Sequence, residues 1–363
     1  MHVLMFGVND SSPTFIHRQV AFARAAGVTV TVWGGVKGET VARKAAQWMR
    51  VKTGFPMGLS AEQLRQARTA DVFHFQWSPD MFQNHALARM FGKATVFSLR
   101  GTGITIMPHQ PGQERYSAQL RATLPRMSAY HGVSAAILRE GEAFGVVIER
   151  ARVVYTAVDL DFFVPPAQIA PDPTRIVMVG SLLPVKGYAH ALNALHRLRA
   201  LHGMTPRLTI VGEGEARADI EAQIDALALR DQVTLMGRLA PDGVCASMHE
   251  AGVFLHSAVN EGIANVAVEA MACGLPVVTT DVGGMGEAIT DGIEGFLVPA
   301  RDPDGTAAAL ARLLGDDDLR ARMGLAARAR AVRQFSPDRQ GREFAALYAF
   351  AVENEHARRA TWR

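Results

Sequence analysis

The sequence predicts an α/β fold built on parallel sheets, and two observations carry this prediction. Val253–His256 is a short apolar strand, a helix follows over Asn265–Cys273, and Val277–Thr280 is a second apolar strand. Gly274 stands where helices commonly end, and Gly295–Val298 predicts a further strand. In sheets of this kind, ligands bind at the carboxyl ends of the strands. The length of 363 residues fits two domains.

The same alternation runs along the whole chain. Ser12-Pro13 suits the start of a helix that extends to Ala26, where Gly27 follows. Prolines at 165, 166, 171 and 173 mark a linker, and helices are expected from Pro299 to about Glu355. The other predicted strands are His2–Val8, Val28–Trp33, Asp71–Gln76, Ala94–Leu99, Met127–Val133, Arg152–Tyr155, Arg175–Val179, Leu208–Val211 and Val233–Met236.

Composition excludes several classes of protein. Hydrophobic residues make up 48%, as in an ordinary globular protein, and no apolar run approaches the ~18–20 residues of a membrane-spanning helix. The amino-terminal residues read as a first strand and not as a signal peptide. Cys245 and Cys273 have neither disulfide-framework nor metal-site spacing, so a reducing cytoplasm is expected.

Charge is distributed unevenly. Residues 1–165 hold 18 basic and 11 acidic residues (+7), whereas residues 166–363 hold 20 and 24 (−4). A basic half favours an anionic partner: a membrane surface or lipid-phosphate acceptor, or simply a solvated surface. Residues 41–52, with Trp48 among basic residues, fit a helix on a membrane or an ordinary surface helix. No nucleic-acid-reading motif appears.

Two carboxylates are the first candidate site residues. Glu261 lies in the loop after the strand ending at His256, and Glu269 lies in an apolar helix, where a charge needs a partner. A vicinal diol could be that partner, because it donates two hydrogen bonds to one carboxylate. The backbone N–H groups of residues 263–266 at the helix start would suit a phosphate. Alternatively, Glu261 is a solvated acid and Glu269 pairs with a lysine or arginine elsewhere.

The string from Glu261 to Val278 resembles the donor-site signature of retaining, nucleotide-sugar-dependent glycosyltransferases of family 4 (group 1), which have the GT-B fold. The shared features are the Glu-x7-Glu spacing and the Glu-Ala-Met-Ala-x-Gly-x-Pro-Val-Val run. The resemblance implies that Glu261 holds hydroxyls of the transferred sugar and Glu269 the ribose hydroxyls. It also places Gly262, Ile263, Ala264, Asn265 and Val266 at the donor.

Three further segments carry the donor-side resemblance. The family's Gly-Arg-Leu-x-x-x-Lys-Gly pattern is kept at Lys186 but has Ser181 in place of the arginine. The diphosphate is therefore expected to bind through Lys186 and backbone, unless Arg100 or Arg238 reaches across. Gly212-Glu213 corresponds to the wall of the nucleotide pocket. Arg238-Leu239 corresponds to the loop that meets the base.

The first half resembles the family more loosely. Arg100 stands where many relatives have a histidine close to the transferred sugar, and it cannot accept a proton. Asn9 and Asp10 are candidates for touching the acceptor, or else plain turn formers. Residues 101–113 are expected to form a flexible loop over the acceptor.

Together these features predict a GT-B protein with two Rossmann-like domains whose parallel sheets face an interdomain cleft. The domains are expected at 1–165 for the acceptor and 166–335 for the nucleotide sugar, with 336–363 as a helix crossing back. The resemblance implies a retaining hexosyltransferase of EC 2.4, acting in bacterial polysaccharide, lipopolysaccharide or glycolipid synthesis. The candidate catalytic residues are Glu261 and Arg100, although Arg100 departs from the family pattern. The expected partners are a UDP- or GDP-sugar and a sugar or lipid-linked acceptor.

Neither a metal nor a cofactor is expected, because no Asp-x-Asp motif is present and Lys186 with helix termini can neutralise the leaving diphosphate. The protein is expected in the cytoplasm, either free or peripheral on the inner face of the membrane. Two alternatives remain: a sugar-nucleotide epimerase of the same fold, and a sugar-nucleotide-binding subunit without transfer activity.

Overall fold

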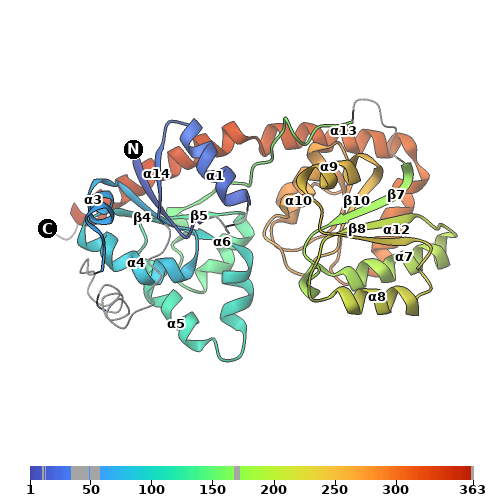
Figure 1. Cartoon of the computed structure of the whole chain (residues 1–363), viewed down its shortest axis with the longest axis horizontal. Helices are drawn as coiled ribbons and strands as arrows, with labels where there is room; N and C mark the ends of the chain where they lie inside the picture. Colours follow the sequence, from blue (N-terminus) through green and yellow to red (C-terminus); the bar gives the residue numbers. More distant parts are fainter. Residues whose placement is uncertain (10–11, 13, 34–48, 50–57, 167–171, 361–363) are drawn as a thin grey trace. The chain divides into compact units, whose positions relative to one another are not determined.

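The structure is a computed structural model that describes residues 1–9, 12, 14–33, 49, 58–166 and 172–360. The chain divides into two compact units (Figure 1). Unit 1 comprises Met1–Ala157 together with Pro337–Arg363, and unit 2 comprises Val158–Ser336. The last helix therefore belongs to the amino-terminal unit.

Unit 1 contains a six-stranded parallel sheet in the order β2-β1-β3-β4-β5-β6. Its described strands are β1 (His2–Phe6), β2 (Thr29–Trp33), β3 (Val72–Phe75), β4 (Ala94–Leu99), β5 (Ala129–Gly132) and β6 (Ala151–Val153). Its described helices are α1 (Thr14–Ala25), α3 (Ala61–Thr69), α4 (Ser78–Met90), α5 (Glu114–Thr123), α6 (Ala135–Glu142) and α14 (Pro337–Ala360), with short helical turns at Leu124–Arg126 and Ile148–Arg150.

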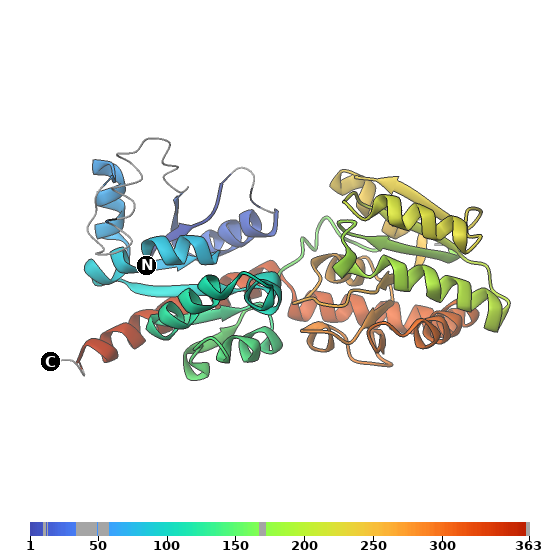
Figure 2. The same ribbon diagram turned by 90° about the horizontal axis from the view of Figure 1, so that it is seen from below.

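The two faces of this sheet bury alternate residues of each strand, as pleating requires. Val3 and Met5 pack with α1 and α14, whereas Leu4 and Phe6 pack with the opposite helices. Figure 1 shows α1 beside α14, and Figure 2 shows helices on both sides of the strands. The parallel sheet predicted from the sequence is thus confirmed, with helices on both faces.

Helix α14 is also fixed to the sheet by buried polar side chains. The His74 ring meets Tyr348 Oη of α14 through Nδ1 (2.9 Å) and Ser98 Oγ through Nε2 (2.8 Å). Ser98 in turn meets His131 Nδ1 at 2.8 Å. Burial lowers the pKa of His131 to about 3 and that of His74 well below its usual range. Both imidazoles are therefore neutral at physiological pH.

Unit 2 contains a second six-stranded parallel sheet, in the order β12-β11-β10-β7-β8-β9. If β7 to β12 are numbered 1 to 6, the order from β9 to β12 is 3-2-1-4-5-6, which is the doubly wound Rossmann order. Its strands are β7 (Asp172–Val179), β8 (Arg207–Val211), β9 (Val233–Gly237), β10 (Ala251–His256), β11 (Val277–Thr280) and β12 (Gly295–Val298). Its helices are α7 (Tyr188–His202), α8 (Arg217–Ala226), α9 (Pro241–His249), α10 (Asn265–Ala272), α11 (Met285–Ala288), α12 (Pro303–Gly315) and α13 (Asp317–Gln334), and a short helical turn spans Pro184–Lys186.

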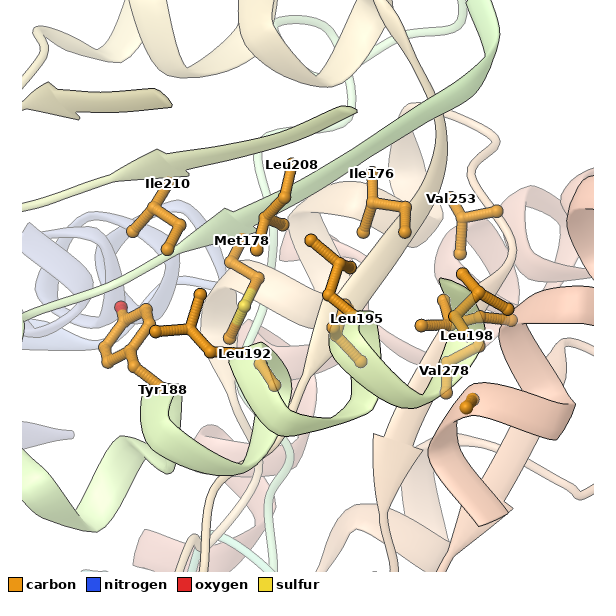
Figure 3. Packing of buried hydrophobic residues seen from close by; sticks show 14 of the residues in the cluster. Ile176, Met178, Tyr188, Leu192, Leu195, Leu198, Leu208, Ile210, Val253 and Val278 are labelled. Atoms are coloured by element: carbon orange, nitrogen blue, oxygen red, sulfur yellow. The ribbon is translucent and has the colours of Figure 1, made fainter. Parts of the chain in front are cut away.

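Helix α7 provides the clearest view of this core. Figure 3 shows Leu192, Leu195 and Leu198 of α7 on the side of the helix that faces the sheet, near Met178, Ile176 and Val253 respectively. The three leucines recur at intervals of three residues, so they share one face of the helix. This packing fixes the start of α7, where the loop that leaves β7 ends.

One prediction about local structure is wrong. The segment expected to be a loop, 101–113, forms a π-helical turn at Thr102–Ile106 and a 3₁₀ turn at Met107–His109. Ile104 is buried, and Tyr116 Oη donates to the Gly103 carbonyl at 2.9 Å. The glycines and Pro108 suggested a loop, but the apolar residues among them tie the segment to the core.

Candidate functional site

The carboxyl ends of β7 and β10 lie side by side in unit 2, at the point where the strand order reverses. In doubly wound sheets this switch point is where ligands bind. The loops that leave the two strands are joined by backbone: Val259 N–H donates to Val185 O at 2.9 Å. Ser257 Oγ also donates to Gly187 O at 2.9 Å. Two loops about seventy residues apart in sequence therefore form one rigid corner.

Gly187 makes this corner possible. Its φ of 70° lies in the left-handed region, and a Cβ there would stand 1.9 Å from the Ser257 carbonyl oxygen. Only glycine combines that φ with so close an approach. The residue just before it, Lys186, is thereby directed at the loop that follows β10.

Lys186 Nζ forms an ion pair with Glu261 Oε2, the candidate sugar-binding carboxylate. The two side chains are 27% and 17% exposed, so the pair is partly shielded from water. His256, the last residue of β10, places Nε2 3.5 Å from the same oxygen while Nδ1 meets Thr279 Oγ1 at 3.0 Å. The structure thus brings together two predicted residues and adds His256, which the sequence prediction missed.

The charge of Glu261 is strongly favoured by these neighbours. Burial alone would raise the pKa of the carboxyl, but the nearby His256 ring and the charge of Lys186 lower that pKa to about 2. Glu261 is therefore ionised at any physiological pH, and it acts as an acceptor of hydrogen bonds and not as a proton donor.

The loop after Glu261 leads into α10, and its start is open to an anion. Gly262, Ile263 and Ala264 are buried, and no side chain caps the helix among the described residues. Ala264 N–H points at Met285 Sδ (3.4 Å), a weak acceptor. The half-buried Asn265 and Val266 open the first turn, where the helix dipole favours negative charge.

Glu269 lies one turn further along α10 and is half-buried. Burial raises the pKa of the Cys245 and Cys273 thiols, and the negative charge of Glu269 raises both values further. The Glu269 carboxylate therefore lies near the two thiols.

The turn after β11 lies against the Glu261 loop. A Cβ on Gly283 (φ 55°) would stand 1.7 Å from the Glu261 carbonyl oxygen. Gly284 N–H donates to Gly262 O at 2.6 Å, so the turn after β11 supports the Glu261 loop.

The remaining donor-side candidates follow the ends of β7, β8 and β9. Gly212 N–H donates to Gly237 O at 2.8 Å, and Leu182 N–H donates to Glu213 O at 2.9 Å, which links the three strand ends. The Glu213 carboxylate is taken by Arg217 Nη1 at 2.7 Å. Of the other residues at these strand ends, Ser181 and Arg238 are exposed, and Leu239 is half-buried.

Arg100 follows β4 in unit 1 and is directed inwards. Its Nη2 donates to Gln76 Oε1 at 2.7 Å and to Gln19 Oε1 at 3.0 Å, and its guanidinium lies 4.8 Å from the Phe15 ring centroid. Burial lowers the pKa of Arg100 to about 10, which leaves it charged at neutral pH. Within the described residues, Arg100 Nε is buried without a partner. Nη2 is therefore committed to the two glutamine side chains, and the buried Nε–H has no partner among the described residues.

The other acceptor-side predictions receive less structural description. Asn9 follows β1, and its N–H donates to Ser12 Oγ at 2.9 Å. Asp10 and Trp48 lie outside the described residues. Sequence reasoning missed Asp80, whose carboxylate lies against Gly7 at the end of β1 and whose pKa burial raises to about 6. No motif identified it, because its position depends on the pairing of β1 with β3.

A second group that the sequence did not suggest lies behind α10. Cys245, His249 and Cys273 place their ligand atoms within 4.8 Å of one another. The prediction that the cysteines lack metal spacing overlooked His249, four residues after Cys245 on the same helix. However, His249 Nε2 already meets Val164 O at 2.7 Å, and the Cys245 thiol donates to Phe162 O at 3.7 Å.

In the part of the chain that the structure describes, none of the helices is both long and apolar enough to cross a bilayer.

Comparison with known proteins places unit 2 in a family. Residues 161–330 match the model of the family "Glycosyl transferases group 1". A D-inositol 3-phosphate glycosyltransferase of Xylanimonas cellulosilytica is 31% identical over 233 residues, covering 59% of this chain and 55% of the relative. A glycogen synthase of Mycobacterium tuberculosis is 28% identical over 305 residues, covering 77% and 70%. The chain thus spans about half the length of the first of these relatives.

Solved structures support the fold over nearly the whole chain. Anabaena HepE in complex with UDP superposes with a TM-score of 0.76 at 17% identity, over 96% of this chain and 99% of that one. Sucrose-phosphate synthase from Thermosynechococcus elongatus gives 0.76 at 18% identity, over 96% and 98%. The two parallel six-stranded sheets are consistent with the two Rossmann-like domains of the GT-B fold. Residues 161–330, which make up most of unit 2, therefore match the group 1 glycosyltransferases.

Proposed function

We propose that the protein transfers a sugar, with retention of anomeric configuration, from a nucleoside diphosphate sugar to an acceptor hydroxyl. The observation that carries this proposal is the Lys186–Glu261 pair at the switch point of unit 2, beside the uncapped start of α10. A cation and an open helix terminus suit a diphosphate, and an ionised carboxylate suits sugar hydroxyls. The HepE structures hold UDP and UDP-glucose, which supports a donor of this class.

The residues of unit 2 would divide the donor between them. Lys186 and the N–H groups of Asn265 and Val266 would hold the diphosphate, and Glu269 would accept hydrogen bonds from the ribose diol. Glu261 would turn from Lys186 towards the hydroxyls of the sugar. The acceptor oxygen forms its bond to the anomeric carbon as the bond to the diphosphate breaks, and the departing phosphate takes the acceptor proton.

Unit 1 would bind the acceptor, with Asn9, Asp10 and Arg100 as the proposed contacts. Two relatives of this chain support a phosphorylated or membrane-bound acceptor class. One is the D-inositol 3-phosphate glycosyltransferase. The other is the gpi3 subunit of phosphatidylinositol N-acetylglucosaminyltransferase from Schizosaccharomyces pombe, which is 30% identical over 155 residues. An acceptor of that kind fits the +7 balance of residues 1–165 and a location in the cytoplasm or at the inner face of the membrane.

Slow hydrolysis of the donor tests the proposal without a known acceptor. The purified protein is incubated with UDP-, GDP- and ADP-sugars in excess EDTA, and released nucleoside diphosphate and sugar are identified by mass spectrometry and NMR. We expect one donor to be cleaved and the released sugar to keep the anomeric configuration that it had in the donor. Lys186→Gln should abolish this cleavage. If no donor is cleaved in EDTA and added Mg²⁺ restores cleavage, the reaction depends on a metal. Release of an epimer of the sugar would indicate an epimerase.

A further inference from the structure

A cationic cavity lies at the edge of unit 1 opposite the strand ends described above. It has a volume of about 790 Å³, within the range of small-molecule pockets. It is lined by the end of α4, the start of β4, the turn before β5 and the last turns of α14. Because β4 has six residues, the cavity is about 20 Å from Arg100 at the other end of the strand. It is therefore separate from the acceptor edge.

Five permanent cations line this cavity: Arg89, Lys93, Arg126, Arg358 and Arg359. Among the described residues, Glu355 is the one carboxylate in the lining, and it is already engaged by Ser128 Oγ at 2.9 Å and Arg359 Nε at 3.0 Å. The lining therefore carries a net charge of +4, which like-charge repulsion makes costly unless an anion is present.

Some of these cations hold the fold together through hydrogen bonds to backbone carbonyls. Lys93 Nζ donates to Arg68 O at 2.6 Å, and Arg358 Nη1 donates to Arg126 O at 2.9 Å. Cations near the ends of α4 and α14 also complement the helix dipoles. Lys93, Arg358 and Arg359 are accounted for in this way, and Arg89 in the last turn of α4 complements the dipole of that helix. Among the described residues, two guanidinium groups in the lining still have no acidic partner.

Arg89 and Arg126 are those two groups. No carboxylate of the described residues lies within 4.0 Å of either, and both side chains are exposed. Arg89 of α4 and Arg126 of the turn before β5 line the same cavity. Their charges also add to burial in lowering the pKa of His85 in the cavity wall. Two guanidinium groups that line one cavity are suited to the oxygens of a phosphate group.

We propose that this cavity binds a phosphate ester, with Arg89 and Arg126 as its principal ligands. Met90, Phe91 and Met127 supply an apolar wall, so the ester carries an apolar portion beside its phosphate. The phosphate belongs either to a lipid headgroup or to a free metabolite, and both present the same oxygens. The site is distinct from the donor site of unit 2, so the inference does not depend on the proposed transfer reaction.

The test compares Arg89→Gln/Arg126→Gln with a matched control, Arg115→Gln/Arg139→Gln. The control removes two exposed arginines of the same unit that lie outside the cavity. Inorganic tripolyphosphate is titrated calorimetrically into each full-length protein at low salt. We expect the cavity variant to bind at least tenfold more weakly than wild type and the control to bind within twofold of it.

Vesicles then distinguish the two sources. Co-sedimentation is measured with phosphatidylcholine vesicles with and without phosphatidylglycerol. If the cavity variant loses binding to anionic vesicles and the control does not, the phosphate is that of a lipid headgroup. If only tripolyphosphate binding falls, the ligand is a free phosphate ester. Equal binding of both probes by the cavity variant and wild type, or no binding by wild type, would overturn the site.

A stability measurement guards against misfolding as the cause. Because the two arginines repel their neighbours in the unliganded protein, Arg89→Gln/Arg126→Gln should melt at or above the wild-type temperature. A clear fall in melting temperature would show that the arginines are structural and would count against the proposal.

Discussion

At the scale of single residues, the account depends on carboxylates and cations held in fixed positions. Glu261 and Lys186 were identified from sequence, and the structure shows that they meet. His256 was not identified, since a histidine that ends a strand has no signature of its own until the loop folds back over it. The same holds for Asp80, because its surroundings come from a neighbouring strand.

Glu269→Ala is expected to weaken nucleoside diphosphate binding with little effect on folding. Charge-assisted hydrogen bonds to the ribose diol contribute about 1.5–3 kcal/mol, so affinity should fall by roughly 10- to 150-fold. Calorimetry of the best-binding diphosphate measures this, with Asp318→Ala, an exposed carboxylate on α13, as the control. Unchanged affinity in Glu269→Ala would remove the ribose role.

The ion pair of Glu261 predicts a particular pH dependence. Since the folded-state pKa of about 2 lies below the unfolded value of about 4.5, ionised Glu261 stabilises the fold above pH 4.5, and this stabilisation is lost as the pH falls towards 2. Wild type and Glu261→Gln should therefore differ in free energy of unfolding by about 3 kcal/mol at pH 7. Urea denaturation should show that difference shrinking between pH 4.5 and pH 3; a constant difference would contradict the assignment.

Arg100 gives a prediction that separates packing from chemistry. Arg100→Ala leaves the oxygens of Gln19 and Gln76 without their donor, so the free energy of unfolding should fall by about 2 kcal/mol. Arg100→Lys keeps the charge and one donor, and should recover most of that stability. If Arg100 also binds the acceptor, Arg100→Lys transfers sugar poorly despite its stability, because a point charge does not replace a fork. Normal transfer by Arg100→Lys would assign Arg100 to packing alone.

At the scale of elements, periodicity located nearly all the strands and helices around the site. The strands predicted at Val277–Thr280 and Gly295–Val298 have those bounds in the structure. Periodicity did not predict the helical turns within residues 101–113, because a single π-helical turn is too short to produce a repeating hydrophobic pattern. What periodicity cannot supply is the joining of two distant loops, which rests on backbone contacts around Gly187.

The corner between the two loops can be tested with a pair of glycines. Gly187→Ala and Gly203→Ala both place alanine at a φ near 70°, which costs about 1–2 kcal/mol. Only at Gly187 does the added Cβ meet backbone; nothing lies within 4 Å of it at Gly203. We expect Gly187→Ala to lower the melting temperature markedly more and to abolish donor binding. Equal effects of the two substitutions would show that the corner is loose.

At the scale of the whole molecule, the strand orders of the two units explain why function concentrates where it does. Each order reverses once, between β7 and β10 in unit 2 and between β1 and β3 in unit 1. The sequence predicted parallel sheets from strand and helix alternation, but strand order needs contacts between distant segments. The net charge of +7 over residues 1–165 did not locate the cationic cavity of unit 1, because its lining comes from three separate segments and includes Arg358 and Arg359 of α14.

The central claim is that unit 2 binds a nucleoside diphosphate sugar through Lys186. The most direct measurement is calorimetric titration of UDP, GDP and ADP, each with and without glucose, in EDTA. The account predicts that at least one diphosphate binds to the wild type and that Lys186→Gln loses most of this affinity. Arg197→Gln, a surface cation of the same unit, should bind normally. Binding that is unchanged in Lys186→Gln, or no binding of any diphosphate by the wild type, would contradict the account.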